Sequence, residues 1–279
     1  MCATCGCGGE AAIVLDHPHD HDRDHGHDHH HPHPHEHPHV HDHGHDHEHR
    51  PAGVVELEAR ILAKNDALAQ KNRGWFAGRE ILALNLVGAP GAGKTALIER
   101  TIAELGGEPP LYIIEGDQAT ALDSERVRKA GAASVQVNTG TGCHLDAAMV
   151  AHGLAHLRPG PGALVLIENV GNLVCPALFD LGEAAKVVLF SITEGEEKPV
   201  KYPHMFGAAD LVILNKTDLA PYLDFAIDKA VANVRAVNPA AQILKLSART
   251  GEGMAAWRDW LRQRLREARE AVFEPGADA

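Results

Sequence analysis

The chain has 279 residues and a formal net charge of −12, and 44% of its residues are hydrophobic but only 4% aromatic. This size and composition fit one globular domain, or one domain with a flexible extension. They exclude a nucleic-acid surface, which needs a basic face and stacking aromatic rings. The apolar runs are strand-sized and the start lacks an export pattern, so we expect a cytoplasmic protein with no membrane partner.

Residues 1–10 form a cysteine-rich tip. Cys2, Cys5 and Cys7 place three thiols close together, and Gly6 allows a tight turn between them. Thiolates suit soft and borderline ions such as Zn²⁺, Cu⁺ and Ni²⁺, so we interpret the tip as a metal site. The alternative is a redox dithiol, which would need a strand–helix scaffold that this segment lacks.

Residues 11–50 are rich in His, Asp, Pro and Gly and hold seventeen of the 21 histidines. A segment with so few apolar residues cannot offset its ordering entropy by burial, so we expect it to be disordered. Many imidazoles on a flexible chain should bind several divalent ions with modest affinity at each site. The alternative, a solubilising spacer, would not require so many histidines.

Residues 51–279 have an ordinary composition and are expected to form the folded domain. Helical apolar spacing begins near Leu57 and Ile61, and Gly74 is a possible stop. Seven short apolar runs then predict strands at 81–88, 111–117, 133–140, 163–169, 186–193, 210–216 and 242–248. Helix-compatible segments lie between most of them, at 95–105, 119–130, 145–157, 223–237 and 253–268. This alternation is typical of an α/β domain with a mostly parallel central sheet and helices on both faces.

The first predicted strand of this domain ends in GAPGAGKT, which matches the phosphate-binding pattern GxxxxGK[ST] between a strand and a helix. Gly88, Gly91 and Gly93 let backbone N–H groups close around phosphate oxygens, and the following helix adds a favourable dipole. Lys94 is expected to reach the β- and γ-phosphates during catalysis, and the Thr95 hydroxyl to ligate Mg²⁺.

A second nucleotide motif, NKTD, ends a later predicted strand. Asp218 can accept two hydrogen bonds from guanine that adenine does not offer, which selects GTP over ATP. Asn215 is expected to tie this loop to the phosphate-binding loop, and the Lys216 stem to pack on the base. Ser247 and Ala248 close the last strand, where GTPases usually place a backbone contact to guanine. We therefore expect a GTPase that converts GTP and water to GDP and phosphate.

Two acidic strand ends are candidates for the catalytic carboxylate. Asp117 closes the segment Glu115-Gly116-Asp117, and Glu168 opens the segment ENVGN. A carboxylate at such a strand end can bind Mg²⁺ or orient the attacking water. The sequence does not choose between the two, and the alternative for each is a helix N-cap.

Cys143, His144 and Cys175 lie on loops after predicted strands, at the sheet edge where ligands gather. Two thiolates and an imidazole form an open metal site whose fourth ligand could come from water or from a second copy of the chain. The alternative is that these residues only pack. His152, His156 and His204 are interpreted as surface or helix-face histidines.

The chain resembles the HypB family of GTPases, which assist nickel insertion into [NiFe] hydrogenase. The resemblance rests on six features together: CxxCxC at the start, the His-rich tract, GAPGAGKT, ENVGNLVCPA, NKTD and TGTGCHLDA. The resemblance covers the chain from Cys2 to about Trp260. It implies a SIMIBI-class P-loop fold, slow GTP hydrolysis that serves as a timer, and a GTP-dependent homodimer. Its implied partners are other hydrogenase maturation proteins and the precursor of the hydrogenase large subunit.

The resemblance also assigns the metal ligands. It implies a tight nickel site at Cys2, Cys5 and Cys7, and a second nickel or zinc site at the dimer interface on Cys143, His144 and Cys175. One alternative is a UreG-like urease nickel GTPase, whose Cys-Pro-His triplet differs from Cys175-Pro176-Ala177 here. Another is a nickel or zinc storage protein in which the GTPase domain is ancillary.

Overall fold

The structure is a computed structural model that describes residues 12–13, 52–117, 127, 129–140 and 142–270. The expected metal tip at residues 1–10, nearly all of the His-rich tract and most of the expected helix at 119–130 lie outside the described residues. Among the described residues, no helix combines the length and apolar character that a bilayer span requires.

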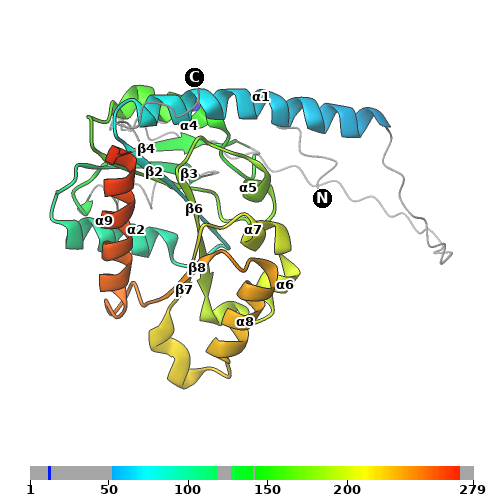
Figure 1. Ribbon diagram of the computed structural model, residues 1–279, viewed down its shortest axis with the longest axis vertical. Helices are drawn as coiled ribbons and strands as arrows, with labels where there is room; N and C mark the ends of the chain where they lie inside the picture. Colours follow the sequence, from blue (N-terminus) through cyan, green and yellow to red (C-terminus); the bar gives the residue numbers. More distant parts are fainter. Residues whose placement is uncertain (1–11, 14–51, 118–126, 128, 141, 271–279) are drawn as a thin grey trace, which may run out of the picture.

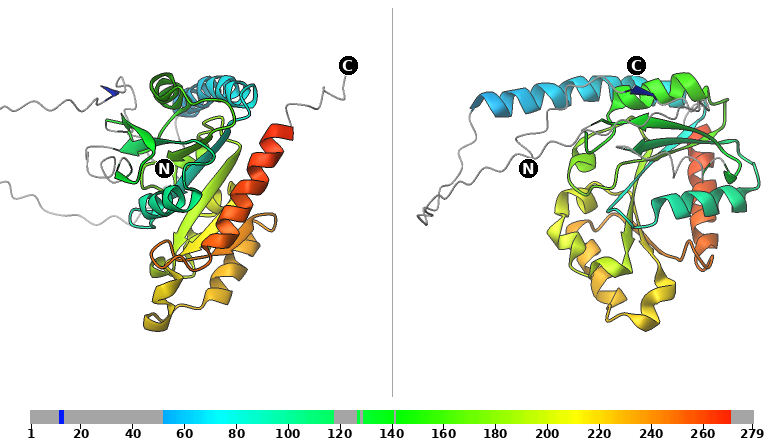
Figure 2. Two further views of the ribbon diagram at one scale, coloured as in Figure 1. Left: turned by 90° about the vertical axis from the view of Figure 1, so that its left-hand side faces the viewer. Right: turned by 180° about the vertical axis from the view of Figure 1, so that it is seen from behind.

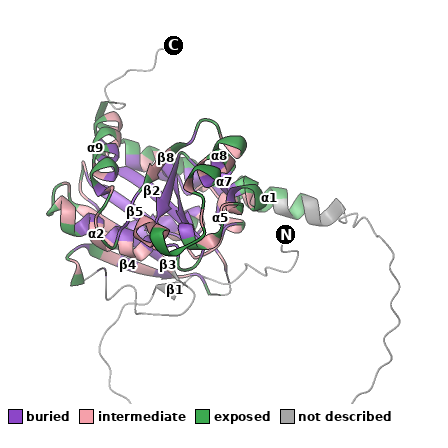
Figure 3. Ribbon diagram, turned by 90° about the horizontal axis from the view of Figure 1, so that it is seen from below, coloured by how far each residue is buried: buried purple, intermediate pink, exposed green. Residues whose placement is uncertain are grey.

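An eight-stranded sheet with the order β1-β4-β3-β5-β2-β6-β7-β8 organises the described chain (Figure 1). The strands β2 to β8 pair in parallel, which confirms the expected fold class. All seven strands expected from the sequence are present, as β2 Leu82–Gly88, β3 Leu111–Asp117, β4 Ala133–Asn138, β5 Leu164–Glu168, β6 Ala185–Ser191, β7 Leu211–Asn215 and β8 Gln242–Lys245. Every residue of β2, β5, β6 and β7 is buried, because helices cover both faces of the sheet (Figure 3).

One short strand is an exception to the expected disorder of residues 11–50. Ala12–Ile13 form β1, which pairs antiparallel with β4 in the register Ala12 to Asn138 and Ile13 to Val137. The two residues belong to the short apolar run that precedes the histidines. Their pairing covers the edge of β4, whose backbone groups would otherwise face solvent.

The helices divide between the two faces of the sheet (Figure 2). On one face, α2 (Lys94–Leu105) and α9 (Met254–Glu270) enclose a core with the buried side chains of Leu84 and Trp257. On the other face, α1 (Ala52–Ala77) and α4 (Ala147–Leu157) cover β3, β4 and β5. The short helices α5 (Cys175–Leu178), α6 (Lys198–Lys201) and α7 (Pro203–Gly207), together with α8 (Ile227–Val237), lie over β6 and β7.

Two helix boundaries differ from the expectation by three residues or more. Gly74 lies inside α1, which continues to Ala77 because Phe76 is buried in the core and offsets the glycine penalty of about 1 kcal/mol. The helix α8 begins at Ile227 instead of residue 223, because the 3₁₀ helix η2 (Thr217–Tyr222) contains Pro221 and the chain then extends through Ala226.

Candidate nucleotide and metal sites

The phosphate-binding loop joins β2 to α2, as its sequence predicts. Gly93 is the residue before α2 and has a φ of 99°, a backbone angle that residues with a side chain rarely adopt. A Cβ atom at this position would also collide with the side-chain amide of Asn215. Lys94 is 7% exposed, and its Nζ lies 3.3 Å from Gly88 O and 3.4 Å from Ala89 O. The loop is therefore packed tightly enough that glycine is required where the two nucleotide motifs meet.

A cavity of about 600 Å³ opens beside this loop. Its lining comes from four separate segments, namely Pro90, Gly91, Gly93, Lys94, Thr95 and Ala96, then Glu115 and Gly116, then Glu168, Asn169, Val170 and Gly171, and finally Lys216. The loop lies at the N-terminus of α2, where backbone N–H groups and the helix dipole favour phosphate. The cavity therefore has the position and chemistry of a nucleotide phosphate site.

Hydroxyl and carboxylate oxygens gather in the same cavity. The Thr95 hydroxyl donates a hydrogen bond of 2.8 Å to Glu168 Oε1, and Glu168 is 8% exposed. Glu115 also lines the cavity and is 4% exposed. Hydroxyl and carboxylate oxygens are the donors that Mg²⁺ prefers, and buried carboxylates are stabilised by a neighbouring cation. These residues therefore fit the magnesium ion that the motif implies.

The structure describes the side chain of Glu115 but not that of Asp117. Asp117 is the last residue of β3, but its side chain lies outside the described part of the chain, so its catalytic role stays a prediction. Glu115 was not among the residues expected to act in catalysis, although it lines the cavity. Residues two apart on a strand share a face, so the pattern alone does not separate them.

The guanine motif is tied to the phosphate-binding loop by its side chains. Asn215 Nδ2 donates to Ala92 O at 2.9 Å, which is the expected contact, and Lys216 Nζ donates to Gly91 O at 2.6 Å. Asn215 Oδ1 accepts a hydrogen bond of 3.2 Å from the backbone N–H of Ala248. Asn215 thus joins all three nucleotide loops.

The Asp218 carboxylate of the NKTD motif is itself held in place by a hydrogen bond. Ser247 Oγ donates to Asp218 Oδ1 at 2.6 Å, and Ser247 is fully buried. The Ser247 hydroxyl binds only Oδ1 of the carboxylate and does not bind Oδ2. The sequence predicts a backbone contact to guanine from Ser247 and Ala248, but no sequence signal indicated this orienting role of the serine side chain.

The three expected internal metal ligands lie together. The Cys143 and Cys175 sulfurs are 2.9 Å apart, and His144 Nδ1 is 3.8 Å from the Cys143 sulfur. Ligand atoms of all three residues lie within 4.8 Å of one another. Two soft sulfurs and an imidazole suit a borderline transition-metal ion, and three protein ligands leave a coordination position open.

Packing favours the neutral form of the His144 imidazole. The ring is 3.9 Å from the ring of Phe179, measured between centroids, and the residue is 8% exposed. Burial lowers the pKa of His144, while the nearby Asp146 carboxylate opposes the shift. A neutral imidazole is the form that ligates a metal, so less proton competition has to be overcome.

Among the described residues, three further histidines are not part of this cluster. His152, His156 and His204 are exposed on α4 and α7, which agrees with their interpretation as surface histidines. Cys2, Cys5 and Cys7 lie outside the described residues, so the N-terminal metal site stays a prediction.

The lowered pKa of His144 predicts a pH-dependent contribution to folding in the metal-free protein. The unfolded chain takes up a proton near the ordinary value of 6.5, whereas folded His144 resists protonation until the pH is lower. The parent should therefore lose stability relative to His144→Gln as the pH falls below 6.5. Urea unfolding in the presence of a chelator measures this difference, with His204→Gln as a control for substituting an exposed histidine. A pH-independent difference between the parent and His144→Gln would contradict the prediction.

Comparisons with known proteins agree with this geometry. Residues 82–245 match the family model described as CobW/HypB/UreG, nucleotide-binding domain. The hydrogenase maturation factor HypB of Rhizobium leguminosarum bv. viciae is 55% identical over 219 residues, which cover 78% of this chain and 73% of that protein. The crystal structure of HypB from Archaeoglobus fulgidus has a TM-score of 0.68 at 43% identity and covers 73% of this chain and 99% of its own. The crystal structure of HypB from Helicobacter pylori in complex with nickel has a TM-score of 0.69 at 33% identity and covers 73% and 96%. The chain therefore belongs to the HypB family, whose nucleotide-binding domain is of the kind shared by CobW, HypB and UreG.

Proposed function

We propose that this chain is a GTP-hydrolysing nickel metallochaperone that acts in the cytoplasm during maturation of [NiFe] hydrogenase. Its relatives named as HypB support this role, and its partners would be other maturation proteins and the precursor of the hydrogenase large subunit. One observation carries the proposal. The connection that begins with Glu168 at the nucleotide cavity ends with Cys175 in the thiol–imidazole cluster, so the two sites share a segment.

The side chains around the cavity divide the work of GTP hydrolysis. Lys94 would neutralise charge on the β- and γ-phosphates, and Thr95 with Glu168 would hold Mg²⁺, which stabilises the charge that develops as the phosphoryl group leaves. Glu168 or Asp117 would orient the attacking water. The tight packing of Gly88 and Gly93 against neighbouring segments fixes the donors before the reaction, which is how preorganised sites lower a barrier.

Nickel is the cargo of the internal site, and zinc is the alternative occupant. Cys143, His144 and Cys175 supply three ligands, so a water or a second copy of the chain would complete the shell. Two apolar side chains flank Cys175 on the surface, Val174 at 41% and Leu178 at 51% exposed. An apolar rim around an incomplete metal site supports a homodimer that closes over the ion and that GTP stabilises.

The test of the proposed GTPase activity is the substitution Lys94→Ala. Loss of one charged donor at a phosphoryl-transfer site should lower GTP turnover by roughly 10²- to 10³-fold while the fold survives. Steady-state phosphate release from the purified variant measures the effect, and circular dichroism checks the fold. Lys201→Ala, at an exposed position of α6, is the matched control and should retain the parent rate. Parental turnover in Lys94→Ala would show that catalysis occurs elsewhere.

The guanine preference is tested by Asp218→Asn. The amide presents a donor where the carboxylate accepted, so GTP affinity should fall by roughly 10- to 100-fold and xanthosine triphosphate should be discriminated against less. Competition binding with fluorescent nucleotides measures both effects. Asp259→Asn on the exposed face of α9 is the control for charge removal. An unchanged nucleotide preference in Asp218→Asn would overturn this assignment.

The two proposed N-terminal metal functions should be separable. Deletion of residues 16–50 removes flexible imidazole sites, and it should lower the number of bound nickel ions while one tight thiolate site at Cys2, Cys5 and Cys7 remains. Serine at these three positions in the otherwise intact chain should have the opposite effect. Equilibrium dialysis with nickel compares the two proteins. Loss of all tight binding after the deletion would refute independent sites.

A further inference from the structure

A seam of buried polar side chains crosses the centre of the sheet, between the apolar core under α1 and α4 and the apolar core under α7 and α8. Its members are Asn85 on β2, Lys186 on β6, and Asn169 and Glu183 on the adjacent loops, and none is more than 8% exposed. A buried polar group destabilises a fold unless it is hydrogen-bonded, and apolar residues would fill this space without that requirement.

The seam begins at the nucleotide cavity. Asn169 follows Glu168, which accepts the hydrogen bond from Thr95, and it lines the cavity beside Val170. Its side-chain oxygen accepts hydrogen bonds from the backbone N–H of Val170 at 3.0 Å and of Leu145 at 3.1 Å. Leu145 directly follows the metal ligand His144. One amide side chain therefore holds a wall of the nucleotide cavity and the loop that carries Cys143 and His144.

A second residue that lines the nucleotide cavity, Gly116, packs closely against the same leucine. A Cβ atom added to Gly116, which lines the cavity, would lie only 2.6 Å from Leu145 Cγ. Leu145 is fully buried, so it has little room to move independently of this wall.

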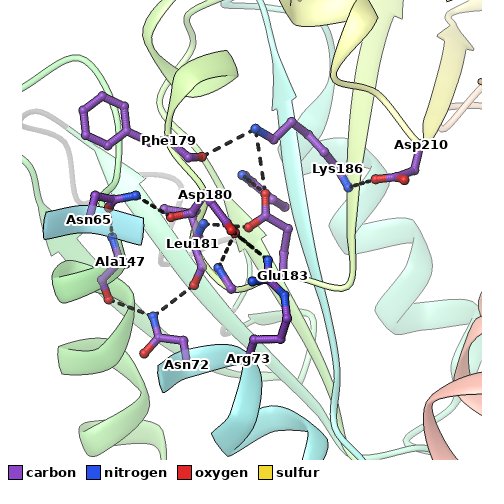
Figure 4. A network of polar contacts seen from close by, with 12 residues as sticks. Asn65, Asn72, Arg73, Ala147, Phe179, Asp180, Leu181, Glu183, Lys186 and Asp210 are labelled. Carbon is purple, nitrogen blue, oxygen red and sulfur yellow. Dashed lines mark hydrogen bonds and ion pairs between the residues drawn. The ribbon is translucent and has the colours of Figure 1, made fainter. Parts of the chain in front are cut away.

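The seam continues to the second metal-bearing segment. Asn169 Nδ2 donates to Asn85 Oδ1 at 3.2 Å, and Asn85 Nδ2 donates to Glu183 Oε1 at 3.0 Å. Lys186 Nζ lies 3.9 Å from Glu183 Oε1 (Figure 4). It also donates to Pro176 O at 2.9 Å. Pro176 directly follows the metal ligand Cys175. The seam thus contacts the backbone of both segments that carry the ligands, the one with Cys143 and His144 and the one with Cys175.

Glu183 accepts a hydrogen bond at each of its two carboxylate oxygens. Glu183 Oε2 accepts a bond of 2.7 Å from the backbone N–H of Leu181. Burial raises the pKa of Glu183, and the Lys186 ammonium opposes this shift. Both oxygens of Glu183 and both polar atoms of Asn85 take part in hydrogen bonds. A displacement at one end of the seam therefore changes the hydrogen bonds along its whole length.

We infer that Asn85 is a positioning residue that couples the two sites of the proposed function, because the buried relay Asn169–Asn85–Glu183–Lys186 joins the nucleotide cavity to both segments that carry the internal metal ligands. This inference rests on the proposed nickel and GTP binding. A γ-phosphate contact at Val170 or Gly171 shifts the backbone that carries Asn169, and the relay passes this shift to Leu145 and Pro176. Coupled sites commonly change each other's affinity by about 5- to 150-fold.

The helix α1 provides a matched control, because it fastens the same two segments without reaching the nucleotide. Asn65 accepts a hydrogen bond from Ala147 N and donates to Asp180 O, at 2.9 and 2.7 Å. Asn72 Nδ2 donates to Ala147 O at 2.8 Å and to Leu181 O at 2.9 Å (Figure 4). Loss of Asn72 should therefore loosen the metal site equally in every nucleotide state.

The test measures nickel affinity in two nucleotide states in the full chain. Cys2, Cys5 and Cys7 are replaced by serine in every protein, so that thiolate-to-nickel charge-transfer absorption reports only on Cys143 and Cys175. Each protein is titrated with nickel in the presence of Mg²⁺ and either GDP or a non-hydrolysable GTP analogue. The His-rich tract is present in all of them and buffers nickel equally, so the ratio of the two affinities isolates the coupling.

The inference predicts that the ratio falls toward one in Asn85→Ser and in the nearly isosteric Glu183→Gln, whereas Asn72→Ala weakens nickel binding but retains the parent ratio. If Asn85→Ser does not fold, Glu183→Gln gives the result. Parental ratios in both relay variants would overturn the relay and leave the proposed function intact. A ratio lost equally in Asn72→Ala would also overturn it, since general loosening would then explain the effect. A parent ratio of one, or no charge-transfer band, would refute the coupled internal site itself.

Discussion

The hydrogen bond between the Thr95 hydroxyl and Glu168 is the contact on which the rest of the site depends. It joins the first turn of α2 to the end of β5, at the centre of the sheet where the strand order reverses beside β2. Ligands in open α/β sheets bind at such a reversal, because loops from neighbouring strands diverge there. The chain that leaves Glu168 runs through Asn169 to Cys175, so the residue that accepts the hydrogen bond from Thr95 also begins the connection that carries Cys175.

The burial of the central strands explains why the fold can be predicted from the sequence. Strands covered on both faces read as continuous apolar runs, and all seven runs from residue 81 onward are strands in the structure. Boundaries set by tertiary contacts were predicted less well. Gly74 does not end α1 because Phe76 packs in the core beyond it, and η2 occupies the residues that precede α8.

The two candidate sites differ in the same way. The segments GAPGAGKT and NKTD could be assigned to a nucleotide site because each motif lies in consecutive residues, and Cys143 with His144 is a local pair. Glu115, which lines the nucleotide cavity, could not be separated from Asp117 by strand alternation. The relay could not be predicted at all, because Asn85 and Glu183 lie 98 residues apart and neither residue type signals a site on its own. Only the folded sheet shows that they are bonded.

The reciprocity of coupled binding gives the most direct test of the claim that one connection serves both sites. If GTP changes nickel affinity at the internal site, nickel must change the preference for a GTP analogue over GDP by the same factor. Nucleotide affinities are measured with and without nickel in the parent and in Cys175→Ala, in which Asn215 and Asp218 are untouched. We expect a nickel-dependent preference in the parent that disappears in Cys175→Ala, and a shift of the parent toward a dimer with the analogue. The same nickel effect in Cys175→Ala would contradict it.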